Sequence, residues 1–322
     1  MRPILIATRG SALALAQANM VLAQCRASFP GQAFELKIIK TTGDKLQTAS
    51  LAQESKTLPK GLFTKELEVA LLEEKADLAV HSLKDLPTDL PTSLKLGAVG
   101  KRADVRDVLI YRSAAGSRQD RGYHANLKIS ELPSGAVVAT SSTRRRAQLL
   151  AVNPNLNSPD IRGNVLTRIQ KVAQRPELDA TILALAGLSR LNYQIGSEGK
   201  LFGENVPEGI LASTLGLEVM LPCVGQGAIG IEIREGDSQV AQFCERLNDL
   251  QTFNCVTAER AFLAGMGGGC QSPVAAYAEV KQGKLHIAAV SFASGPARRA
   301  QATGAPEEAS ALGRQVAAEL KP

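Results

Sequence analysis

The sequence predicts an α/β protein with two units of alternating strands and helices, followed by a smaller α+β domain. Three observations support this fold class. Short apolar runs of strand length alternate with longer stretches of helical periodicity. The alternation starts again after Asp107, and its character changes after about Val240, where helices precede a pair of strands. The length of 322 residues is sufficient for two or three domains.

The first unit opens with a buried strand and a helix rich in alanine and leucine, for which Ser11 is a suitable N-cap. Residues 42–60 are polar with few apolar anchors, and we interpret them as a loop. A later apolar strand brings Lys84 and Asp85 to its carboxyl end, the edge at which open α/β sheets bind ligands. The expected strands are 4–7, 34–41 and 78–82, and the expected helices are 12–27 and 62–74.

The second unit repeats the order of strand, polar turn and helix. Its expected strands are 108–111, 136–139 and 180–184, with helices after the polar turns 140–146 and 162–164. An alternating strand at 229–234 then returns the chain to the first unit. The first domain is therefore expected to be discontinuous, comprising 1–104 and 226–246, with a second domain at 105–225.

The third domain is expected at 247–322. Two helical stretches come first, and two alternating strands follow at 274–280 and 285–292. A short polar turn containing Gly283 separates these strands and predicts a hairpin. A last helix is expected at 307–320.

Composition excludes several classes of protein. An aromatic content of 4% without tryptophan argues against a platform for stacking nucleic-acid bases. The five cysteines form neither a disulfide framework nor CxxC pairs, so we expect a reducing compartment, the cytoplasm, and no bound metal. No stretch predicts a signal peptide or a membrane span. The net charge of +6, with arginines beside glycines and hydroxyls, favours small anionic partners.

Cys270 has the most unusual surroundings of the five cysteines. Three glycines precede it and Pro273 follows, which predicts a tight loop that presents the thiol. None of the three histidines forms a Cys–His hydrolase signature, so covalent attachment is the sharper hypothesis, and a loop cysteine without a role is the alternative. The remaining cysteines fit an inert description better: Cys25, Cys223, Cys244 and Cys255.

Three junctions combine arginine with a hydroxyl, an amide or a glycine at the start of a helix. They lie at 8–11, 141–145 and 162–164. Free backbone N–H groups, the helix dipole and a guanidinium group together suit a carboxylate or a phosphate. Each junction alone also fits an ordinary helix cap with an exposed arginine. Because no nucleotide-binding motif is present, the three together predict a ligand with several carboxylates.

Asp85 is the candidate catalytic group. It stands beside Lys84 at a strand end and ahead of Pro87, where a carboxylate can transfer protons or stabilise a cation. The alternative is a surface Lys–Asp pair in a turn. We expect His81 to be a packed, hydrogen-bonded residue rather than a base.

Several of these motifs occur in the same order in one known family. The chain resembles the porphobilinogen deaminases, also called hydroxymethylbilane synthases, almost from end to end. The motifs that carry the resemblance are Ala7-Thr8-Arg9 with Ser11, Lys60-Gly61-Leu62-Phe63, His81-Ser82-Leu83-Lys84-Asp85, Thr140-Ser141-Ser142 with Arg144 and Arg145, Arg162-Gly163-Asn164, Gly225-Gln226-Gly227 and Gly268-Gly269-Cys270.

The resemblance implies two domains like those of periplasmic binding proteins and a smaller third domain with a dipyrromethane cofactor on a cysteine thioether, for which Cys270 matches. It implies stepwise condensation of four porphobilinogens with loss of ammonia, then hydrolytic release of hydroxymethylbilane, in a monomer with Asp85 as catalyst. The implied cofactor residues are Cys270, Ser82, Lys84, Asp85, Ser142, Arg144, Arg145 and Gly163. The implied substrate residues are Arg9, Ser11, Lys60, Phe63, Arg162, Asn164, Arg168, Arg190 and Gln226.

The chain departs from the family pattern in places. Residues 48–59 look longer than usual, so the second basic residue of this lid is either Lys56 or absent, with Gln53 in a competing alignment. The segments 116–126 and 198–220 also look expanded. A non-catalytic carboxylate receptor is the rival hypothesis, but it needs neither Cys270 nor a third domain.

Overall fold

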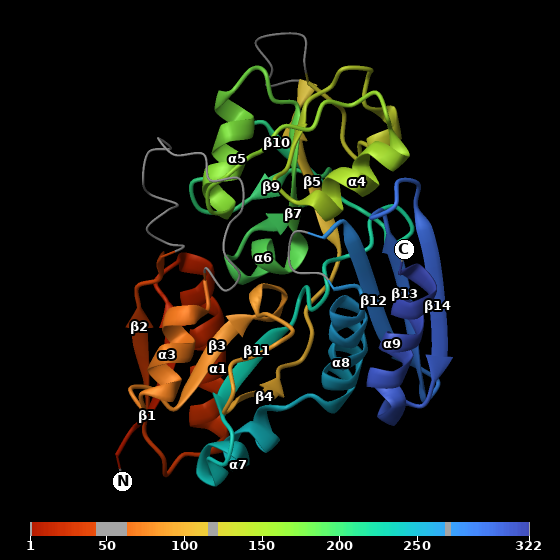
Figure 1. Ribbon diagram of the computed structural model, residues 1–322. Coiled ribbons are helices and arrows are strands. Elements are labelled where there is room, and N and C mark those ends of the chain that lie inside the picture. Colours follow the sequence, from red (N-terminus) through yellow and green to blue (C-terminus); the bar gives the residue numbers. More distant parts are fainter. Residues whose placement is uncertain (1, 43–62, 115–121, 268–271, 322) are drawn as a thin grey trace.

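The computed structural model describes residues 2–42, 63–114, 122–267 and 272–321, and within these the strands form four sheets (Figure 1). The predicted α/β class is confirmed. Three sheets have helices packed against them, and the fourth is a short two-stranded ribbon. Among the described helices, none has both the length and the apolar character needed to cross a bilayer.

The first sheet has the strand order β2-β1-β3-β11-β4. β1 runs parallel to β2 and β3, whereas β11 is antiparallel to β3 and β4. Alternate residues of these strands bury one face under α1 and α7 and the other under α3. The elements are β1 (Ile4–Arg9), α1 (Ala12–Ser28), β2 (Phe34–Ile39), α3 (Lys65–Leu72), β3 (Leu78–Ser82), β4 (Leu94–Val99), β11 (Ile229–Arg234), α7 (Ser238–Leu247) and a 3-10 turn, η1 (Leu83–Asp85).

The second sheet has the order β10-β5-β7-β6, with β5 antiparallel to both neighbours. The interiors of β5 and β7 are mostly apolar because helices or loops cover both faces, while β5 begins with Asp107 and ends with Arg112. The elements are β5 (Asp107–Arg112), η3 (Ile129–Glu131), β6 (Val138–Ala139), α4 (Thr143–Val152), α5 (Val165–Gln174), β7 (Ala180–Ala184), α6 (Leu185–Arg190), β8 (Gln194–Ile195), β9 (Leu201–Phe202) and β10 (Ile210–Thr214).

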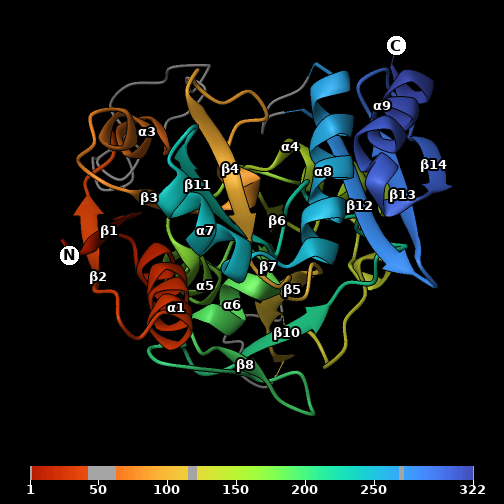
Figure 2. The same cartoon turned by 90° about the horizontal axis from the view of Figure 1, so that it is seen from below.

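The third sheet, β12-β13-β14, is covered on one face by α8 and α9 (Figures 1 and 2). The two helices approach closely at Gly313, where an added Cβ would lie 2.1 Å from the carbonyl oxygen of Ala258. Only glycine fits there without a shift of backbone. The elements are α8 (Leu250–Gly265), β12 (Val274–Lys281), β13 (Lys284–Ser291), β14 (Arg298–Gly304), η4 (Pro306–Glu308) and α9 (Ala309–Leu320).

The structure differs from the sequence interpretation in several details. The expected hairpin is part of a three-stranded sheet, because β14 pairs along the whole of β13. β4 and β10 were not predicted either. Cys25, Cys244 and Cys255 are buried as expected, but Cys223 is only partly buried and lies in the loop between β10 and β11. The expectation for 42–60 falls almost wholly outside the described residues.

Candidate active site

The end of β3 places the predicted catalytic group. The strand ends at Ser82, and a single 3-10 turn then closes with the Leu86 amide donating to the Leu83 carbonyl. Leu83 is buried and anchors this turn, while Lys84 and Asp85 are half-buried at the edge of the sheet. Leu86 has extended backbone, as expected before a proline, so the turn cannot continue as a helix.

A small cavity of about 60 Å³ opens beside this turn. The Arg9 guanidinium lies over the Phe63 ring, 4.2 Å from its centroid. The predicted site residues that line the cavity are Arg9, Ser11, Phe63, Ser82 and Asp85. The structure therefore brings together residues from three separate segments of the sequence.

Gln17 also lines this cavity, although the sequence gave no reason to select it. Its side chain is 2% exposed, and its amide nitrogen donates to the Ser82 hydroxyl at 2.8 Å. The same hydroxyl donates back to the Gln17 amide oxygen at 3.0 Å. This exchange fixes the Ser82 side chain at the entrance to the Asp85 turn.

Arg144 and Arg145 lie at the start of α4 and share one buried carboxylate. Arg144 Nη2 donates to Asp107 Oδ2 at 2.8 Å, and Arg145 Nη2 donates to Asp107 Oδ1 at 2.7 Å. Gln226 donates to the same oxygen at 2.9 Å. Burial alone would raise the pKa of Asp107, but the two guanidinium groups outweigh it and hold that pKa far below its usual range. Asp107 was not predicted as a site residue.

All three helix junctions have a side-chain cap, which is the alternative that each junction alone allowed, and the N-cap predicted at Ser11 is confirmed. The side chains of Ser11, Ser142 and Asn164 accept hydrogen bonds from the backbone amides three residues later. Gly163 has φ +117, and a Cβ there would lie 2.7 Å from Thr167 Cγ2. Its carbonyl accepts a hydrogen bond from Arg168 Nε at 2.8 Å.

Electrostatic interactions link the Asp85 turn to the second sheet. Burial lowers the pKa of Lys84, and the neighbouring Arg145 lowers it further, while Asp85 opposes the shift. Burial and Arg145 also lower the pKa of Arg168 to about 10, again against the effect of Asp85. Burial lowers the pKa of Arg190 to about 10. Each cation is less stable here than in water, which is the condition under which an anionic ligand binds strongly.

Hydrogen-bond accounting supports the same conclusion. Within the described residues, the Nε atoms of Arg144, Arg145 and Arg190 are buried and have no hydrogen-bond partner. A buried guanidinium N–H without an acceptor is costly. The residues present therefore fit a ligand that carries carboxylate groups, such as a pyrrole with acidic side chains.

The remaining predicted residues divide into two groups. Arg162 and Asn164 are exposed at the start of α5, and Arg190 donates to the Gly227 carbonyl at 2.7 Å. Lys60 and Cys270, together with the lid residues 48–59, lie outside the described residues. Their predicted roles stay predictions.

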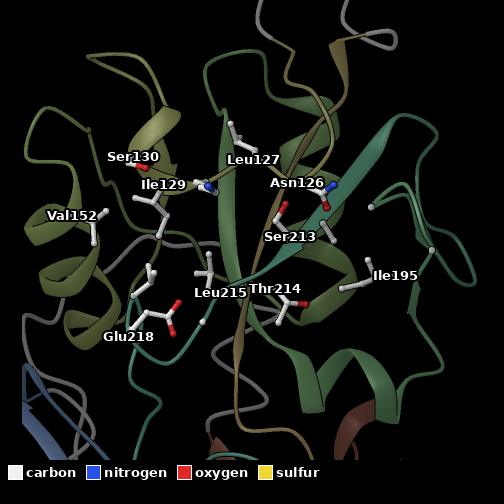
Figure 3. Close-up of a pocket in the computed structure, with 16 residues that line it drawn as sticks. Asn126, Leu127, Ile129, Ser130, Val152, Ile195, Ser213, Thr214, Leu215 and Glu218 are labelled. Atoms are coloured by element: carbon white, nitrogen blue, oxygen red, sulfur yellow. The ribbon is translucent and has the colours of Figure 1, made fainter.

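A larger cavity than the one beside Asp85 lies elsewhere (Figure 3). It measures about 460 Å³ and is lined by residues of the second unit, including Ile129, Ser213 and Glu218. None of the predicted site residues contributes to it. The buried cations and Asp85 lie instead around the end of β3, beside the smaller cavity.

Two family models match the chain. The model described as porphobilinogen deaminase, dipyromethane cofactor binding domain, matches residues 4–242, and the model of the porphobilinogen deaminase C-terminal domain matches residues 253–322. A porphobilinogen deaminase of Geobacillus kaustophilus is 43% identical, with 99% of this chain and 94% of that protein covered. One of Syntrophomonas wolfei is 41% identical, with coverage of 99% and 95%.

Solved structures with a similar arrangement are more distant. The regulatory domain of OxyR2 from Vibrio vulnificus is 14% identical, with a TM-score of 0.42 and coverage of 77% of this chain and 94% of that chain. The probable amino-acid ABC transporter extracellular-binding protein ytmK from Bacillus subtilis is 10% identical, with a TM-score of 0.41 and coverage of 77% and 90%. Neither likeness bears on function.

Proposed function

The chain belongs to the porphobilinogen deaminase family, and from this premise we propose that Asp85 is its catalytic residue. The protein is a transferase of tetrapyrrole biosynthesis. It condenses four porphobilinogen molecules one after another onto a dipyrromethane cofactor, with loss of ammonia, and releases hydroxymethylbilane by hydrolysis. The observation that carries the proposal for Asp85 is its place at the end of β3, within electrostatic reach of Lys84 and Arg168.

We assign the buried cations to the cofactor. When bound, the dipyrromethane supplies a carbon nucleophile that no protein side chain provides. Its acidic side chains would lie against Lys84, Arg144 and Arg145, whose positive charges favour carboxylates. The buried Nε atoms of Arg144 and Arg145, which have no hydrogen-bond partner among the described residues, favour them as well. Ser82, Ser142 and Gly163 complete this set, and Cys270 is the proposed thioether anchor. Tethering makes the attack effectively intramolecular.

Asp85 acts on charge that develops during the reaction. Loss of ammonia from porphobilinogen leaves an electron-poor pyrrole, and a carboxylate near the pyrrole nitrogen stabilises this charge more in the transition state than in the ground state. The same carboxylate could accept the α-proton that the ring acting as carbon nucleophile loses when the new carbon–carbon bond forms.

The substrate site is proposed around the small cavity. Arg9 and Ser11 would bind the carboxylates of the incoming porphobilinogen, with Phe63 and Lys60 at its border. Towards the second sheet, the growing chain would meet a further set of polar residues. These are Arg162, Asn164, Arg168, Arg190 and Gln226.

The domain boundaries are part of the same proposal. The three helix-covered sheets support a division into 1–104 with 226–246, 105–225 and 247–322. We also propose that the protein acts as a monomer in the cytoplasm. The five cysteines of the sequence show no disulfide framework and no CxxC pairs, which supports a protein of a reducing compartment.

Ammonia release tests the proposed function against a carboxylate receptor. Purified protein incubated with porphobilinogen is expected to release one ammonia for each porphobilinogen consumed, and one hydroxymethylbilane for every four, because each condensation expels one amine. Both products are measured over time by colorimetric assay and chromatography. Saturable binding of porphobilinogen by folded, unmodified protein without ammonia release would favour the receptor.

A further inference from the structure

Three ionisable side chains that the proposed mechanism does not use meet on the inner face of α3. Glu68 of α3 is 8% exposed, His81 of β3 is 5% exposed and Glu232 of β11 is 0% exposed. His81 Nε2 lies 3.0 Å from Glu232 Oε2. Glu232 is the register partner of Ala79, which shares a face of β3 with His81. The cluster therefore links one helix to two neighbouring strands.

The hydrogen bonds of this cluster are incomplete when both glutamates are ionised. Within the described residues, Glu68 Oε1 and Glu232 Oε1 are buried and accept no hydrogen bond. Two buried carboxylates beside a single imidazole leave a negative charge without a counterion, which is costly in an apolar core. A proton on one carboxyl group removes that charge and converts an acceptor into a donor.

Glu68 is the carboxyl group that best retains such a proton. Burial raises its pKa, and the nearby Glu232 and Glu66 raise it further, whereas Thr64 and His81 act in the opposite direction. Glu232 lies on β11, His81 on β3 and Glu66 on α3, and Thr64 is the N-cap of α3. The other strands packed against α3 contribute apolar side chains to this face, Ala7 from β1 and Leu94 from β4.

The cluster lies directly behind the candidate site. His81 precedes Ser82 in β3, and it lines the same cavity as Asp85. Thr64 is the N-cap residue of α3 and also lines that cavity, next to Phe63. The position of α3 on the sheet therefore sets where Phe63 and Thr64 stand in the cavity.

We propose that Glu68, His81 and Glu232 are positioning residues for the Asp85 cavity, and that a protonated Glu68 keeps α3 docked against β3 and β11. The proposal deepens the function proposed above and rests on it. Ionisation of Glu68 would place a second negative charge beside Glu232 and loosen α3. Phe63 and Thr64 would then leave their places in the cavity, and binding of porphobilinogen would weaken.

The pH dependence of porphobilinogen binding tests this proposal. For a carboxyl group whose pKa is raised on folding, the stabilisation is complete below the unfolded pKa and is lost as the pH rises through the folded pKa. The KM of the unchanged protein for porphobilinogen is thus expected to rise once the pH exceeds the pKa of Glu68 in the folded protein, by up to about tenfold per pH unit. Glu68→Gln, which cannot ionise, should keep a low KM over the same range with kcat little changed.

Thermal unfolding gives a second readout that needs no activity. The Tm of Glu68→Gln relative to the unchanged protein should increase with pH, by roughly 2–4 °C over the range in which Glu68 ionises. Glu68→Met, of similar length and also neutral, should show the same rise in Tm with pH relative to the unchanged protein. The proposal can therefore still be tested if one of the two variants folds poorly. Glu73→Gln, at the exposed end of the same helix, is the matched control and should follow the unchanged protein.

Parallel pH profiles of KM and Tm in all four proteins would overturn the proposal. Failure of the underlying function is distinguishable from this result. If Asp85→Asn retained full turnover, the role of Asp85 would be lost, whereas a pH-dependent Tm difference in Glu68→Gln would still show that the cluster holds a proton. If Asp85→Asn is inactive and the profiles are parallel, only the positioning role fails.

Discussion

Replacement of Asp85 by asparagine is expected to lower kcat by about 10²- to 10⁴-fold, the contribution of a positioned acid–base group. The amide keeps the shape of the side chain but cannot accept a proton or stabilise a positive charge as a carboxylate does. Because Asp85 is half-buried at the end of a turn that Leu83 anchors, the fold should survive the change. Rates of ammonia and hydroxymethylbilane formation measure the loss.

Two controls make this result specific. Asp89→Asn, an exposed aspartate four residues further on, should leave kcat unchanged. Circular dichroism and intact mass should show that Asp85→Asn is folded and carries its cofactor. Normal ammonia release from a folded, loaded Asp85→Asn would remove Asp85 from the catalytic role.

Replacement of Glu259 by alanine is expected to cost about 3–5 kcal/mol of unfolding free energy. Glu259 of α8 is 0% exposed and accepts from both Arg102 Nη1 at 2.6 Å and Arg102 Nη2 at 2.9 Å. The backbone amides of Gly225 and Ala278 donate to the same carboxylate at 2.8 Å each. Without it, the guanidinium of Arg102 and two amides lose their buried partner. Urea unfolding followed by circular dichroism measures the change.

The Glu259 carboxylate joins three segments that are far apart in the sequence: the chain after β4, the loop before β11, and β12. Its matched control is Glu279→Ala, which removes a partly exposed ion pair with Lys281 on β12. The Glu279→Ala change should lower the free energy of unfolding by no more than about 1 kcal/mol, since ion pairs near the surface contribute little to stability. Equal losses in the two variants would contradict the role of Glu259 as a buried link.

Local signals in the sequence were sufficient for most of the fold. Apolar runs predicted β3, β7 and β11, and the side chains of Ser11, Ser142 and Asn164 predicted where helices begin, because capping depends on neighbours within three residues. β14 gave no such signal. Its sequence is polar and only Ala302 is buried, so its strand conformation comes from pairing with β13.

In the candidate site, too, some residues could be predicted from local sequence and others could not. The Ser82–Asp85 motif is contiguous and could be recognised in the sequence. Gln17, Asp107 and Glu232 could not, since each acts through a partner that only the tertiary structure brings close. Gln17 lies 65 residues from Ser82, and Asp107 lies 37 residues from Arg144. Periodicity and motif order contain no information on such pairs.

Intact-protein mass spectrometry tests the central claim most directly. Purified protein supplied with porphobilinogen is expected to carry an added mass of two linked pyrrole units, and peptide mapping should locate it on Cys270. Cys270→Ser should lack the adduct and lose turnover. A protein that stays unmodified at Cys270 and still produces hydroxymethylbilane at full rate would contradict the account.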